Sequence, residues 1–171
     1  MLFTFLALQG TAVCCLTRSD LTGPFEKRTE KELRLFLNLR SQMAVNKANN
    51  APWTMPELEY PQERLASFDT LLARLPPPLQ VKISGKTRKT ASEFEWSFIF
   101  VRVWRNDFSH FGPKSLLIHK RDIAKHCAIC LELTLNIVEA HGQFANHSRF
   151  GETKVAGNLK TAIRLLSQAL S

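Results

Sequence analysis

The six residues from Arg105 to His110, which read RNDFSH, hold the side chains best suited to acid–base chemistry on a phosphate. The imidazole of His110 titrates near neutral pH, and a place at the C-terminal end of a helix would favour its protonated form. It is therefore suited to act as general acid or general base. The guanidinium of Arg105 offers a planar fork of N–H donors that matches phosphate oxygens. Asn106 is placed to hold the imidazole or to contact the ligand.

RNA is the substrate that such a pair can cut with the fewest additional groups. It carries its own nucleophile, the 2′-hydroxyl, so cleavage needs a proton acceptor, a proton donor for the leaving 5′-oxygen and a cation for the charge on phosphorus. Arg105 and His110 supply these groups. Cleavage of RNA by this route needs no metal and no other cofactor.

The spacing of Arg105 and His110 sets a condition on this chemistry. At about 100° of turn per residue, positions five apart on a regular helix point roughly 140° away from each other. Either the helix unwinds around Phe108 to Pro113, or a second subunit brings its own pair across a two-fold interface.

The R-x-x-x-x-H spacing, the continuation RNDFSHFGPK and the long segment RDIAKHCAICLELTLNIVEA resemble the last two core helices of HEPN ribonucleases. The resemblance covers about residues 94–140 and leaves the first 60 residues unrecognised. It implies a homodimer with a composite site, in which Arg105, Asn106 and His110 act on RNA. It also implies a role as a toxin or antiphage effector, for which an antitoxin would be a partner.

The chain departs from one pattern of that family. Some toxins that it resembles carry a tyrosine two residues after the histidine, which a partner nucleotidyltransferase modifies. That position here is Gly112, and the only tyrosine is Tyr60. Control by this route is not expected.

Two alternatives to a catalytic Arg105 and His110 stay open. Arg121 and His126 also stand five apart, but Asp122 follows the arginine and the pair lies early in a predicted helix, so we favour the first pair. The other alternative is that Arg105 and His110 are structural. The chain would then be a non-catalytic helical module that binds RNA, a nucleotide or a protein partner.

The cysteines offer a metal-site hypothesis that we weigh against core packing. His126, Cys127 and Cys130 would share one helix face, and thiolate with imidazole suits zinc. Cysteine on the inner face of a helix is more often part of the core, so no metal is predicted. With Cys14 and Cys15 the total is four, too few for a disulfide framework in a chain of 171 residues, and the cytoplasm is the expected compartment.

Composition favours a globular protein with an anionic partner. Lys and Arg number 23 against 15 Asp and Glu, a formal net charge of +8, and 44% of residues are hydrophobic. This balance argues against a disordered, collagen-like or coiled-coil chain and favours phosphate-bearing partners. Phosphate-binding glycine loops, serine-hydrolase elbows and His-Glu-x-x-His zinc motifs are absent from the sequence. The residues predicted to bind RNA are Lys82, Lys86, Arg88 and Lys89 in an exposed basic loop, and Lys114.

Apolar residues recur at helical spacing along most of the chain, which predicts an all-α, up-down bundle of five to six helices in one HEPN-like domain over residues 1–171. Residues 46–62 are expected to form a loop, because they contain three prolines and the pair Asn49-Asn50 and show little periodicity. The other expected helices span about 24–44 (with Pro24 in the first turn), 63–75, 94–111, 121–141 and 159–170, the last after a polar loop over 143–157.

The segment FEWSFIFVRVW alternates like a strand, yet we predict a buried helix there. Thr90-Ala91-Ser92-Glu93 and Ser92-Glu93-Phe94-Glu95 both fit the capping box, in which a Ser or Thr oxygen and a Glu side chain satisfy first-turn N–H groups.

The opening segment, Met1 to Thr17, carries no charged side chain. A buried first helix is the preferred interpretation, because a basic region expected of a signal peptide is missing and 17 residues are short for a membrane span. A signal peptide and a membrane anchor are the alternatives, and no membrane partner is predicted.

Overall fold

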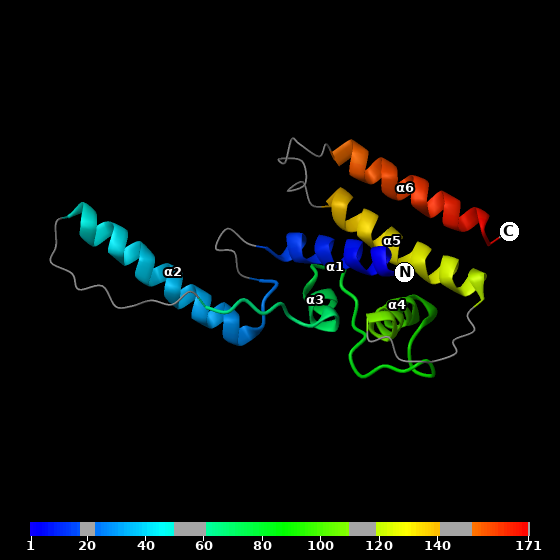
Figure 1. Cartoon of the computed structure of the whole chain (residues 1–171), viewed down its shortest axis with the longest axis horizontal. Coiled ribbons are helices and arrows are strands. Elements are labelled where there is room, and N and C mark those ends of the chain that lie inside the picture. Colours follow the sequence, from blue (N-terminus) through cyan, green and yellow to red (C-terminus); the bar gives the residue numbers. More distant parts are fainter. Residues whose placement is uncertain (18–22, 50–60, 110–118, 141–151, 171) are drawn as a thin grey trace. The chain divides into compact units, whose positions relative to one another are not determined.

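The computed structural model describes residues 1–17, 23–49, 61–109, 119–140 and 152–170. These residues form six helices, and the only β-structure among them is one isolated antiparallel bridge between Phe25 and Leu65. The prediction of an all-α helical bundle is therefore confirmed (Figure 1). Within the described residues, none of the helices is long and apolar enough to cross a membrane.

Contacts between Cα atoms group the chain into two compact units. The first unit comprises Met1–Cys15 and Phe68–Ser171, and the second comprises Leu16–Ser67. The single domain expected over 1–171 stays a prediction.

Five helices make up the first unit: α1 (Leu2–Leu16), α3 (Phe68–Arg74), α4 (Glu93–Ser109), α5 (Lys120–Ala140) and α6 (Glu152–Gln168). The buried side chains of this unit lie on α1, α3, α4, α5 and the residues between α3 and α4, and full burial of each large apolar side chain contributes about 1.5–3 kcal/mol. The side chains with at most 3% of their surface exposed include Phe5, Leu8, Leu71, Leu72, Phe98, Val101, Cys130 and Ile137.

The N-terminal segment forms the expected helix, α1, but only one of its faces is buried. Phe5, Leu8 and Ala12 are buried at four-residue and three-residue spacing, as the inner face of a helix requires. Phe3 is 84% exposed and Leu6 is 49% exposed on the other face. The segment is a helix that packs against the unit on one side.

Helix α4 forms in spite of its strand-like alternation, and the capping box is the reason. The Ser92 backbone N–H donates to Glu95 Oε2 at 2.9 Å, and the Glu95 N–H donates to Ser92 Oγ at 3.2 Å. Of the two capping boxes that the sequence allowed, this is the one that forms, because Thr90 Oγ1 instead accepts from the Thr87 N–H at 2.9 Å. The expectation of a buried helix holds for one side of α4 only: Phe98 and Val101 are fully buried, whereas Phe94 is 47% exposed and Val103 is 42% exposed.

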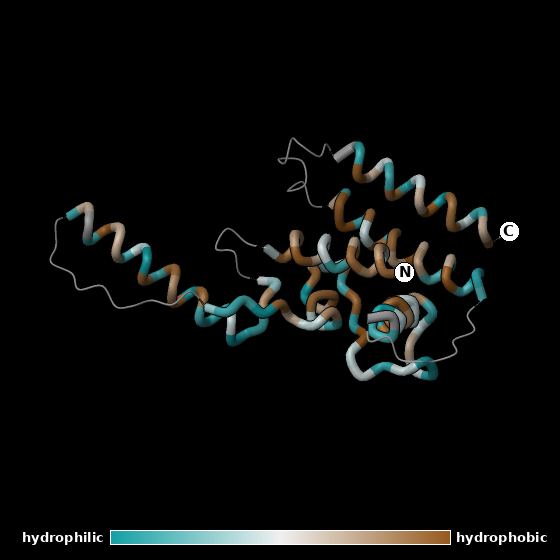
Figure 2. Tube along the Cα trace, in the orientation of Figure 1, coloured by the Kyte–Doolittle hydropathy of each residue, from teal (hydrophilic) through white to brown (hydrophobic). Residues whose placement is uncertain are grey.

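Helices α5 and α6 lie side by side (Figure 1). Lys160 of α6 forms an ion pair with Glu139 of α5 at 2.8 Å. Hydrophobic and hydrophilic residues alternate along α6 in Figure 2, and none of its described side chains is fully buried. The expected helix over 121–141 is confirmed as α5. The helix expected from residue 159 begins earlier, at Glu152, because Gly157 is accommodated inside it and its carbonyl accepts the Thr161 hydroxyl at 3.0 Å.

The second unit contains α2 (Lys27–Ala48) and the extended residues that approach its start. Pro24 is not in the first turn of the helix: its carbonyl accepts the Ala66 N–H at 2.9 Å, and the Glu26 N–H donates to the Arg64 carbonyl at 2.9 Å. These bonds pair residues 24–26 with 64–66 and leave Lys27 to start α2.

Backbone hydrogen bonds explain two wrong boundaries. The helix expected over 63–75 is reduced to Phe68–Arg74, since residues 64–66 use their backbone groups in the bridge instead. The loop expected from residue 46 starts later, because α2 continues to Ala48 and the Asn49 N–H still donates to the Val45 carbonyl at 3.0 Å. The rest of that loop, over 50–60, lies outside the described residues.

Candidate functional site

Arg105 lies near the C-terminal end of α4, four residues before its last residue, Ser109. Its guanidinium carbon is 5.1 Å from the centroid of the Phe5 ring of α1. Its Nη1 donates to Asn106 Oδ1 at 2.9 Å. The ring supports one face of the guanidinium and the amide fixes its plane, so Arg105 has a defined orientation at the end of the helix.

Of the other two residues of the motif, Asn106 and His110, the structure describes only Asn106. Asn106 is exposed and its oxygen accepts from Arg105, so Asn106 orients the guanidinium. His110 follows Ser109, the last residue of α4, and lies with Lys114 outside the described residues.

The basic loop before α4 is exposed as predicted, but its cations have different surroundings. Lys82 and Lys89 are exposed. Lys86 forms an ion pair with Glu95, and this ammonium is the main cause that lowers the pKa of Glu95. Arg88 lies over the Trp96 ring, 5.8 Å from its centroid. Trp96 and Arg105 are nine residues apart on α4, which places them on opposite sides of the helix. The contact between Arg88 and Trp96 therefore places Arg88 on the side of α4 opposite Arg105.

A groove of about 300 Å³ lies on the Trp96 side of α4, against the first turns of α5. We call it the α4–α5 groove. It is lined by Arg88, Ala91, Glu93, Trp96, Phe100, Asp122, Lys125 and His126. This groove was not among the predicted sites, although two aromatic residues at i and i+4 near the start of α4, Trp96 and Phe100, were a sequence signal for a shared aromatic face.

His126 forms the inner wall of the α4–α5 groove and is 7% exposed. The Ser97 hydroxyl donates to the Glu93 carbonyl at 3.0 Å, so its oxygen must accept at 2.9 Å from His126 Nδ1. This bond fixes the neutral tautomer with the proton on Nδ1 and the lone pair on Nε2. Burial is the main cause that lowers the pKa of His126, followed by the positive charge of Lys125.

The charges around the α4–α5 groove are balanced. Lys125 of α5 forms an ion pair with Glu93 of α4. Within the described residues, no ion pair is formed by the other two charged groups of the lining, Arg88 and Asp122. The groove thus presents one guanidinium and one carboxylate beside two aromatic rings.

The two alternatives that involve His126 find no support in this geometry. Arg121 is exposed and His126 is bonded to Ser97, on the regular helix α5. Cys130 is fully buried and donates its S–H to the Ser97 carbonyl at 3.7 Å. In the described parts of the chain, no group of three or more His, Cys, Asp or Glu side chains is placed to hold a metal ion.

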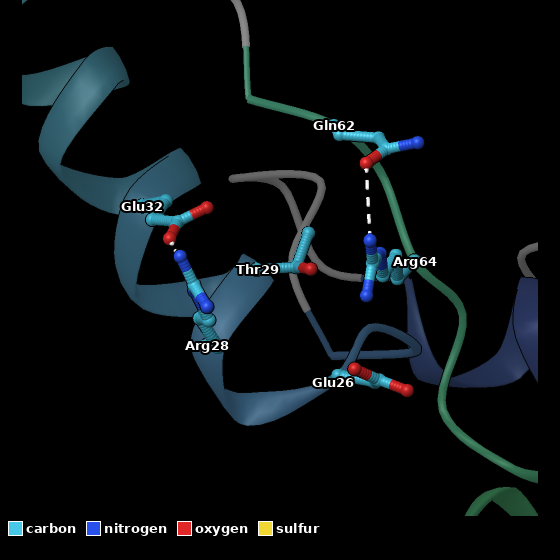
Figure 3. Close-up of a pocket in the computed structure, with 6 residues that line it drawn as sticks. All are labelled: Glu26, Arg28, Thr29, Glu32, Gln62 and Arg64. Carbon is cyan, nitrogen blue, oxygen red and sulfur yellow. Dashed lines mark hydrogen bonds and ion pairs between the residues drawn. The ribbon is translucent and has the colours of Figure 1, made fainter.

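A second pocket, of about 180 Å³, lies within the second unit and is shown in Figure 3. Arg28 donates to Glu32 at 2.8 Å, and Arg64 donates to Gln62 at 3.2 Å. Glu26 also lines this pocket. Because both guanidinium groups are engaged and two carboxylates share the space, the pocket has no excess of positive charge to attract an anion.

No family model, no curated protein and no solved structure matches this chain. The resemblance to HEPN ribonucleases therefore rests on the residues of the motif alone.

Proposed function

We propose that this chain is a HEPN-like endoribonuclease that cleaves RNA without a metal, with Arg105 and His110 as its catalytic residues. The 2′-hydroxyl attacks the adjacent phosphorus and the P–O5′ bond breaks. His110 accepts the proton of the 2′-hydroxyl and donates a proton to the leaving 5′-oxygen. Arg105 stabilises the negative charge that accumulates on the phosphate oxygens.

The orientation of Arg105 carries the proposal. A guanidinium held by the Phe5 ring at 5.1 Å and by Asn106 at 2.9 Å is preorganised. It therefore loses little side-chain freedom when it binds a phosphate. The net charge of +8 supports the same class of partner, because phosphates are drawn to a basic protein.

The end of α4 supports the role of His110. Helix α4 ends at Ser109, and the carbonyl groups at a helix C-terminus stabilise a nearby positive charge. An imidazolium directly after this end would be a suitable proton donor for the leaving oxygen.

The remaining features of the proposal follow from the motif. A homodimer, in which two protomers bring their pairs to one composite site, meets the condition that the spacing of Arg105 and His110 sets. The proposed setting is a toxin or antiphage effector of the cytoplasm, with an antitoxin as its partner.

The decisive experiment is an RNA cleavage assay in EDTA. Wild-type protein is expected to cut RNA and leave 2′,3′-cyclic phosphate ends, and Arg105→Ala and His110→Ala are each expected to abolish cleavage while staying folded. Arg121→Ala is the matched control, because Arg121 belongs to the second Arg and His pair and is exposed on α5. Full activity in both Arg105→Ala and His110→Ala would remove the assignment.

The α4–α5 groove favours a second candidate function, a non-catalytic module that binds RNA or a nucleotide. Arg88 over Trp96 and the half-exposed Phe100 are side chains on which nucleobases stack. Binding of RNA without cleavage by the wild type, unchanged in His110→Ala, would select this function over the first.

A further inference from the structure

We infer that the α4–α5 groove is a binding site for a guanine base, separate from the proposed catalytic residues. Its volume of about 300 Å³ lies at the lower end of the range typical of small-molecule sites. Trp96 and Phe100 line it four residues apart on α4, and both are half-exposed. Two partly exposed aromatic side chains on one helix face provide an apolar surface on which a base can stack.

His126 supplies an acceptor at the inner wall. Its Nδ1 is committed to Ser97 at 2.9 Å, and its Nε2 has no hydrogen-bond partner among the described residues. The imidazole packs against Phe100, with ring centroids 4.4 Å apart. A histidine that is 7% exposed and keeps its second nitrogen without a partner is ready to accept an N–H from a ligand.

The charged groups at the rim decide which base fits. Asp122 is exposed on the first turn of α5 and has a carboxylate that only accepts hydrogen bonds. Guanine presents two adjacent donors, N1–H and the 2-amino group, which a carboxylate binds together. Adenine presents one donor group beside an acceptor nitrogen, which would face the acceptors Asp122 and His126 Nε2. The excess of acceptors therefore favours guanine.

Arg88 supplies the positive charge of the site, since Lys125 is engaged by Glu93. The Arg88 guanidinium lies over the Trp96 ring, 5.8 Å from its centroid, and comes from the exposed loop before α4. A base that stacks on Trp96 would therefore enter between the ring and the guanidinium, which would cover its second face. The ligand chemistry is the same for a free guanine nucleotide and for a guanine in single-stranded nucleic acid.

The inference does not depend on the proposed cleavage. Trp96 and Arg105 are on opposite sides of α4, so occupation of the groove and chemistry at Arg105 have separate readouts.

The test is a titration of the full chain by calorimetry. The ligands are guanosine 5′-monophosphate, adenosine 5′-monophosphate and a short single-stranded oligothymidine DNA with one deoxyguanosine. This DNA lacks the 2′-hydroxyl and cannot be cleaved by 2′-hydroxyl attack. Wild type is expected to bind the guanine nucleotide about tenfold more tightly than the adenine nucleotide. Trp96→Ala is expected to weaken binding about tenfold, and Asp122→Asn to remove the preference for guanine. Lys89→Ala is the matched control, since Lys89 is exposed beside Arg88 and does not line the groove.

Each outcome has one meaning. Tighter binding of the oligonucleotide than of the mononucleotide would identify a base within nucleic acid as the ligand, and equal binding would identify the free nucleotide. Absence of guanine binding, equal affinity for the two mononucleotides, or unchanged affinity in Trp96→Ala would overturn the inference. None of these results would alter the expected loss of RNA cleavage in Arg105→Ala.

Discussion

Arg102 of α4 forms an ion pair with Asp69 in the first turn of α3. Both side chains are largely buried, with 29% and 17% of their surfaces exposed. The pair uses Asp69 Oδ2, and Asp69 Oδ1 is buried without a hydrogen-bond partner in the described part of the chain. Asp69 therefore depends on Arg102 for compensation of its charge, and Arg102 fixes α4 against α3 one turn before Arg105.

Arg102→Met is expected to lower the free energy of unfolding by about 2 kcal/mol, because it leaves a buried carboxylate without its cation. The double variant with Asp69→Leu is expected to recover most of this loss, since replacement of both partners by apolar groups removes the uncompensated charge. Urea unfolding of the two variants checks this. Equal stability of wild type and Arg102→Met would contradict it.

His126 predicts a dependence of stability on pH. Its pKa in the folded protein lies below the ordinary value of 6.5, mainly because of burial and the charge of Lys125, with Arg88 acting in the same direction and Asp122 opposing it. Below pH 6.5 the unfolded chain therefore binds a proton that the folded chain does not. Stability is complete above this pH and falls as the pH drops below it.

The contribution of His126 can be isolated with His126→Gln. The free energy of unfolding at pH 7.5 minus that at pH 5.5 is expected to be smaller in this variant than in wild type, whatever the absolute stability of the variant. Exposed His119 gives the matched control, His119→Gln, which is expected to keep the wild-type difference. An unchanged difference in His126→Gln would show that the ring is not held neutral.

The capping box of α4 predicts a local effect on stability. Ser92→Ala removes the oxygen that accepts from the Glu95 N–H at 3.2 Å and is expected to cost about 1 kcal/mol. Ser84→Ala is the control, because Ser84 is an exposed serine of the loop before α4 and lies outside the capping box. Thermal unfolding measures the loss of stability in each variant. An equal loss in both would indicate that the hydrogen bond at Ser92 does not stabilise α4.

The sequence was sufficient for features that local chemistry determines. The cap at Ser92 and Glu95 predicted a helix where alternation suggested a strand, and the apolar spacing around Cys130 and Ile137 predicted the inner face of α5. Features set by distant segments were not predictable in this way. The bridge between Phe25 and Leu65 shortened one expected helix, and the contact between His126 and Ser97 joins residues 29 positions apart. The α4–α5 groove depends on that second kind of contact.

The cysteines predict an order of thiol reactivity. Cys14 is exposed, whereas burial and the neighbouring Cys14 raise the pKa of Cys15 to about 11. Cys127 and Cys130 are buried, and burial raises the pKa of the Cys130 thiol further. At pH 8 Cys14 is therefore expected to react first with a thiol reagent, Cys15 slowly, and the other two only on unfolding.

Absorbance on reaction with a disulfide reagent measures this order. Cys14→Ser is expected to remove the fast phase, and urea is expected to release the two thiols of α5. Rapid reaction of all four thiols in the native protein would contradict the burial of Cys127 and Cys130.

The contact between Arg105 and Phe5 gives a prediction that connects the fold with the proposed chemistry. Phe5→Leu keeps an apolar side chain in the core, where it also loses the ring contact with Phe68 at 4.7 Å, and removes the aromatic face under the guanidinium. A cation over a ring contributes about 0.5–2 kcal/mol, so cleavage of RNA is expected to fall about threefold to thirtyfold. The fall should appear in kcat rather than in KM, because the orientation of Arg105 matters most for the charge that develops in the transition state. Phe3→Leu, at an 84% exposed position on the same helix, is the matched control and is expected to keep wild-type activity. An equal effect of the two variants, or a change confined to KM, would show that the ring under Arg105 does not orient it for cleavage.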